Sequence, residues 1–141
     1  MPALSTLLQP DVKVRAILRA IALTGYAGIL IAGSIPGARA EVGEFAPGVV
    51  LHSLAYAGLA ALWFLASTGS PVQRALRAML AIALMGALDE GIQSFLPYRS
   101  GAVGDWMIDV TAATVAAIVL AVLATLAPKP RGSRAAAARR R

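Results

Sequence analysis

The side chains of this chain that could do chemistry are a few polar residues set among long apolar runs. In one run Asp89 and Glu90 are adjacent, and Gln93 follows three residues after Glu90. Residues three apart share a helix face, whereas neighbours are turned by about 100°. We therefore expect Glu90 to point into the protein with Gln93 beside it. The plainer alternative, more for Asp89 than for Glu90, is a side chain that reaches the lipid headgroups.

Two other apolar runs carry polar pairs with helical spacing. His52 and Tyr56 are four residues apart, as are Asp105 and Asp109, so each pair lies on one helix face. The plain interpretation of His52 is a structural histidine. Asp105 follows Gly104 and suits a helix N-cap, where a carboxylate accepts amide hydrogen bonds. Asp109 lies beyond the first turn, so capping does not explain it.

The charges of these residues do not balance. Asp89, Glu90, Asp105 and Asp109 face a single nearby cation, Arg99, whose guanidinium can bridge carboxylates in a bidentate manner. A bare excess of negative charge cannot persist in a low-dielectric site, so the acids must take up protons, bind a cation or face water. The candidate ligand-binding residues are therefore His52, Tyr56, Glu90, Gln93, Arg99, Asp105 and Asp109.

The composition decides what kind of protein must position these residues. Hydrophobic residues make up 58% of the 141 residues and charged residues only 14%, whereas soluble domains carry roughly 25% charged residues. The basic residues punctuate apolar runs and form no continuous face, which excludes a nucleic-acid groove. The absence of cysteine excludes disulfides, thiolate metal sites and a cysteine nucleophile. We expect an all-α, polytopic membrane protein.

A helix needs about 20 mostly apolar residues to cross a bilayer, and four stretches meet this length. We expect spans over residues 16–35, 48–66, 70–96 and 105–127, which together form a four-helix transmembrane domain over 16–127. Ser70, Pro71 and Gln73 predict a capping box at the start of the third span. We expect residues 1–15 to be a cytoplasmic N-terminus and residues 128–141 a disordered, basic cytoplasmic tail.

The basic residues also predict the orientation. Of the 13 Lys and Arg residues, all but Arg39 and Arg99 fall on the side of the termini, and flanking basic residues stay in the cytoplasm. Both termini should therefore be cytoplasmic, in a multi-pass protein of the cell's inner membrane, with most acids toward the outer face. An alternative is that the first span is a cleavable secretory signal that ends near Pro36 and Ala40.

The polar motifs resemble those of the VanZ-like family of small bacterial membrane proteins. The resemblance runs from about Ser34 to Ala117 and rests on His52-x-x-x-Tyr56, Glu90-x-x-Gln93-x-Phe95-x-Pro97-x-Arg99 and Asp105-x-x-x-Asp109. The family is named for a protein associated with resistance to glycopeptide antibiotics such as teicoplanin, and its biochemical activity is not established. The resemblance implies a bacterial cell-envelope protein with its polar residues at the outer helix ends.

These observations lead to one main hypothesis and three alternatives. We expect an outward polar pocket that binds a cell-envelope lipid or a lipophilic or glycopeptide antibiotic, with no resident cofactor or metal and no nucleic-acid partner. A divalent-metal-dependent intramembrane hydrolase or transferase is the second hypothesis, because carboxylates and one imidazole suit such ions. Proton-linked transport by a homo-oligomer and a purely structural bundle are the others. Whether the chain is an enzyme is therefore left open.

Overall fold

The computed structural model describes residues 7–99 and 101–127, excluding the side chains of residues 39, 40 and 42. Within these residues the regular structure is all helical, as the composition predicts. Four long helices and one short helix follow each other along the chain: α2 (Val12–Gly33), α3 (Ala38–Gly43), α4 (Gly48–Ala66), α5 (Pro71–Ser94) and α6 (Val103–Leu126). The expected tail over 128–141 lies outside the described residues, as does the N-terminal part over 1–6.

The helix starts follow local capping chemistry. At the start of α5 the predicted capping box is confirmed: Ser70 Oγ accepts from the Gln73 amide, and Gln73 Oε1 accepts from the Ser70 amide at 3.0 Å. In contrast, α2 begins four residues earlier than expected, because Asp11 Oδ1 accepts from the amide of Val14 at 2.9 Å and caps the helix.

Three of the long helices, α2, α4 and α6, are long and apolar enough to cross a membrane. Their 19 to 24 residues correspond to roughly 28–36 Å at 1.5 Å per residue. The fourth long helix, α5, has 24 residues but carries two arginines and two acids among them. By length and composition, at least three helices of the molecule could therefore cross a membrane.

The distribution of side chains in α5 is the reverse of that in a soluble helix. Leucines recur every fourth residue along its outer face and are more than half exposed: Leu76, Leu80, Leu84 and Leu88. Four polar side chains of the same helix are buried instead: Arg74, Asp89, Glu90 and Gln93. An apolar surface with polar side chains in the interior is typical of a protein in hydrocarbon, where exposed leucine is stable and polar groups face the bundle interior.

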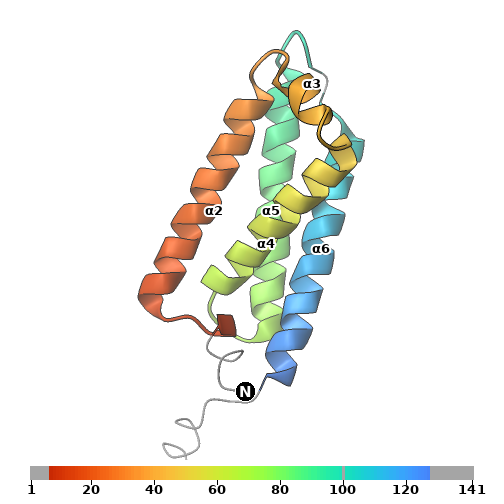
Figure 1. Ribbon diagram of the computed structural model, residues 1–141. Coiled ribbons are helices and arrows are strands. Elements are labelled where there is room, and N and C mark those ends of the chain that lie inside the picture. The colour runs from red at the N-terminus through yellow and green to blue at the C-terminus, as the bar shows by residue number, and fades with distance from the viewer. Residues whose placement is uncertain (1–6, 100, 128–141) are drawn as a thin grey trace, which may run out of the picture.

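The long helices run side by side, with α6 packed along α4 and α5, and α2 packed along α4 (Figure 1). The fully buried side chains at their centre are mostly small, including Ala60, Ala78, Ala113 and Ala117, which lets helix backbones approach closely. One end of the bundle holds α3 and the α5–α6 connection, and the other holds the α4–α5 connection (Figure 1). The polar motifs lie toward the α3 end.

Candidate functional site

Asp89 is the centre of a hydrogen-bonded chain that joins α4, α5 and the α5–α6 connection. The Tyr56 hydroxyl donates to Asp89 Oδ2 at 2.9 Å, and Gln93 Nε2 donates to Asp89 Oδ1 at 2.8 Å. Arg99 Nη2 in turn donates to Gln93 Oε1. Asp89 is only 2% exposed, so its two oxygens depend on these protein donors instead of water.

A second polar pair joins α4 to α6. His52 Nδ1 and Asp109 Oδ1 are 2.9 Å apart, and Asp109 is fully buried. The rings of His52 and Tyr56 are stacked, with centroids 6.0 Å apart, so the two polar groups are adjacent on α4. Asp109 Oδ2 has no hydrogen-bond partner among residues 7–99 and 101–127. A Cβ on Gly86 would lie 3.2 Å from this oxygen, so the glycine leaves room for the carboxylate.

Glu90 completes this part of the site from α5. Its Oε2 accepts from the amide of Ala102 at 2.6 Å, and its buried Oε1 has no partner within the described part of the chain. A Cβ on Gly101 would lie 2.4 Å from the Glu90 carbonyl oxygen, so only glycine lets the α5–α6 connection cross α5 this closely. Ligand atoms of His52, Glu90 and Asp109 all lie within 4.8 Å of one another.

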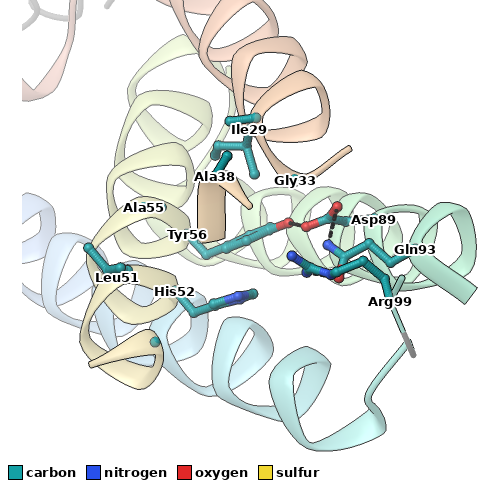
Figure 2. A pocket seen from close by; sticks show the side chains of 12 residues that line it. Ile29, Gly33, Ala38, Leu51, His52, Ala55, Tyr56, Asp89, Gln93 and Arg99 are labelled. Carbon is teal, nitrogen blue, oxygen red and sulfur yellow. Dashed lines mark hydrogen bonds between the residues drawn. The ribbon is translucent and has the colours of Figure 1, made fainter. Parts of the chain in front are cut away.

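A pocket of about 210 Å³ opens beside these residues. Its polar wall consists of His52, Tyr56, Asp89, Gln93 and Arg99, whose side chains gather between α4 and α5 (Figure 2). Its apolar wall comes from α2, α3 and α4, with Ile29, Ala32, Gly33, Ala38, Leu51 and Ala55 among its residues. The pocket therefore offers hydrogen-bonding groups and apolar surface to the same occupant.

Six of the seven candidate residues lie in or directly beside this pocket. His52, Tyr56, Gln93 and Arg99 line the pocket itself. Glu90 and Asp109 are buried behind the pocket. They lie next to it because their carboxylate oxygens are within 4.8 Å of the ring nitrogen of His52, which lines the pocket.

The expected N-cap role of Asp105 is wrong. The N-cap of α6 is Ala102 and the helix begins at Val103, which places Asp105 in the first turn. The Glu90 carboxylate holds the Ala102 amide at the start of the helix, and α6 therefore begins before Asp105. A carboxylate in the first turn still complements the helix dipole.

Glu90 and Gln93 are both buried, as expected, but Gln93 donates to Asp89 and not to Glu90. Residues four apart are as close on a helix as residues three apart, and spacing alone does not choose between them. Here Asp89 is turned toward Tyr56 of α4, while Glu90 is turned toward Ala102. Arg99, whose guanidinium could bridge carboxylates, donates to the Gln93 amide oxygen.

Asp89 is the functional candidate that the sequence reasoning left out. Two features mark Asp89 as part of the site. One is its four-residue spacing from Gln93, and the other is a buried tyrosine donor on another helix. The first is visible in the sequence, but the second depends on how α4 packs against α5.

No family model matches the chain, and no curated protein or solved structure matches it either. The resemblance to the VanZ-like family therefore stays a prediction.

The hydrogen bond of Tyr56 predicts a stability effect that an exposed tyrosine should not show. Tyr56→Phe leaves a buried oxygen of Asp89 without its donor, which should lower the free energy of unfolding by about 1–3 kcal/mol. Tyr98→Phe is the matched control, because Tyr98 also donates to an oxygen, the Ser34 carbonyl, but is exposed. Its effect should stay within about 0.5 kcal/mol. Thermal unfolding in detergent measures both, and equal losses would contradict the central role of Asp89.

Proposed function

We propose that all four long helices cross the inner membrane and that both termini are cytoplasmic. The lipid-facing leucine row of α5 supports a fourth span. With two arginines and two acids, however, α5 is not among the helices whose length and hydropathy alone suit a membrane span. The concentration of basic residues on the side of the termini supports the orientation. In this orientation the pocket opens near the outer leaflet.

We propose further that the pocket binds part of an amphiphilic envelope lipid. The observation that carries this proposal is the pairing of one polar and one apolar wall in the same pocket. Arg99 provides a cation whose buried Nε has no acceptor among the described residues, and guanidinium groups suit phosphate or carboxylate. The apolar residues of α2 and α4 suit the first part of a hydrocarbon chain.

The size of the pocket restricts the occupant. Pockets that enclose drug-sized ligands measure roughly 300–1,000 Å³, and this pocket measures about 210 Å³. A lipid headgroup with the adjoining chain fits this volume better than a whole glycopeptide antibiotic. An antibiotic of that class would place only a lipophilic or charged substituent in the pocket.

The cluster of His52, Glu90 and Asp109 favours a second candidate function, the binding of a divalent cation. Two carboxylate oxygens of this cluster, Glu90 Oε1 and Asp109 Oδ2, are buried without a hydrogen-bond partner in the described residues. One imidazole and two carboxylates resemble the donor sets of metals that activate water. An ion here would lie next to the lipid pocket, where it could serve a hydrolase or transferase.

The proposed orientation predicts which loops a membrane-impermeant thiol reagent can reach. The chain has no cysteine, so single cysteines can be placed at Glu44, after α3, and at Thr68, between α4 and α5. Both residues are exposed. In intact cells, Glu44→Cys should be labelled from outside and Thr68→Cys only after the membrane is opened. The reverse pattern would contradict the orientation.

The proposed ligand site predicts that Arg99 contributes to lipid affinity. Purified protein in a maltoside detergent would be titrated with a polyprenyl phosphate, phosphatidylglycerol, phosphatidylethanolamine and teicoplanin, with binding followed by native mass spectrometry. We expect at least one lipid to bind, with an affinity about tenfold lower in Arg99→Gln, which corresponds to the loss of one charge-assisted contact of about 1.4 kcal/mol. Arg77→Gln is the matched control, because Arg77 is an exposed arginine at the other end of α5. Equal binding of every compound by all three proteins would refute the proposal.

The metal candidate predicts stoichiometric binding of one ion. Protein incubated with Mg²⁺, Mn²⁺ or Zn²⁺ and then passed over a desalting column should retain about one ion per chain, measured by elemental analysis. Asp109→Asn should lose this ion because an amide is a weaker ligand for such ions than a carboxylate. Glu44→Gln, which changes an exposed acid outside the cluster, should retain it. Retention of no ion by the unaltered protein would remove this candidate.

A further inference from the structure

A second polar hollow lies at the opposite end of the bundle, beside the α4–α5 connection. It measures about 190 Å³ and is lined by Gln9, Arg15, Ser67, Thr68, Gly69 and Arg74, among others. It shares no lining residue with the pocket near α3. Whatever it binds is therefore separate from the proposed lipid site.

Arg74 is the unusual residue of this hollow because its charge is buried without an ion-pair partner among residues 7–99 and 101–127. The side chain is 5% exposed; its Nε donates to the Phe64 carbonyl oxygen at 3.0 Å, and its guanidinium lies 4.2 Å from the centre of the Phe64 ring. Its Nη2 is buried and has no hydrogen-bond partner in the part of the chain that the structure describes. Arginine keeps its proton in proteins, so this group stays charged.

The chain provides almost no carboxylate to balance this charge. Asp11 is the only acidic residue before Glu41, and there is none from 45 to 88 or after Asp109. The Asp11 carboxylate accepts from the Val14 amide as the cap of α2. Meanwhile Arg15 lines the same hollow and adds a second positive charge. A buried cation is stable only when it is paired and hydrogen-bonded.

We infer that this hollow is a binding site for a phosphate group, held between Arg15 and Arg74. Guanidinium groups bind phosphate oxygens through paired N–H donors, and Arg74 has the unused Nη2 donor. Thr68 lines the same hollow with a further hydroxyl, whereas the Ser67 hydroxyl there already donates to the Trp63 carbonyl oxygen. The N-terminus of α5 adds the positive end of a helix dipole. The volume of about 190 Å³ exceeds that of a single water, whose share of the liquid is about 30 Å³.

The phosphate can come from the headgroup of an anionic lipid or from solution, and the hollow lies at the bundle end where both sources are within reach. A lipid phosphate at this position would attach the molecule to one leaflet at the end opposite to the pocket near α3. This inference is independent of the proposed lipid pocket, since its residues, its charge and its place in the bundle are different.

The test measures thermal unfolding of the full chain in a phosphate-free maltoside detergent. One series adds inorganic phosphate, with sodium sulfate and sodium chloride at equal ionic strength as references, and the other adds short-chain phosphatidylglycerol. We expect a saturable rise in Tm of about 5 °C or more in at least one series. Saturation with inorganic phosphate identifies a free-anion site, and saturation with the lipid alone identifies a headgroup site. A Tm that follows only ionic strength in both series would overturn the inference.

Variants locate the response. Arg74→Gln and Arg15→Gln should each raise the half-saturating concentration at least tenfold, and the half-exposed Arg15 keeps the test valid if Arg74→Gln does not fold. Lys13→Gln, an exposed cation nearby, should leave the response unchanged. Arg99→Gln distinguishes this hollow from the pocket near α3. If the rise in Tm is retained in Arg99→Gln and lost in Arg15→Gln, the phosphate binds in this hollow. The opposite pattern would assign the phosphate to the pocket near α3 and overturn the inference.

Discussion

Asp89 is buried in an apolar bundle, and a carboxylate in that position must be satisfied by protein donors. Its two oxygens draw together Tyr56 from α4 and Gln93 from α5, and Gln93 in turn orients Arg99 of the α5–α6 connection. Three separate segments are therefore held by one acidic side chain. The polar wall of the pocket is a consequence of this arrangement, because the same donors that satisfy Asp89 also face the cavity.

The close approach of α5 to its neighbours makes this arrangement possible. Gly86 leaves room for the Asp109 carboxylate, and Gly101 lets the α5–α6 connection cross over the backbone of Glu90. The amide of Ala102 then reaches Glu90 and starts α6. Small residues along the helix contacts and polar residues at one end serve complementary roles, since close packing brings the polar groups within hydrogen-bonding distance.

The two ends of the bundle have opposite local charge. Toward α3, the buried polar groups are mainly acids, and two of their oxygens have no hydrogen-bond partner in the described residues. Toward the α4–α5 connection, a guanidinium is buried instead, that of Arg74, and the sequence has no acidic residue from 45 to 88. A low-dielectric interior makes each uncompensated group costly. This contrast is the physical basis for expecting a cation, amine or proton at one end and a phosphate at the other.

Composition and periodicity were sufficient to predict an all-helical structure with helices apolar enough to cross a membrane, the bounds of α4 and the cap of α5, because these depend on local spacing and hydropathy. They also identified six residues that converge at one end, because polar side chains are rare in apolar helices. The choice of Asp89 as the partner of Gln93 was not predictable, since residues three and four apart are equivalent on an isolated helix. Nor was the cap of α6, which depends on a carboxylate from another helix. Both were settled by the rotation of α5 against α4 and α6, a property of helix packing that local sequence does not encode.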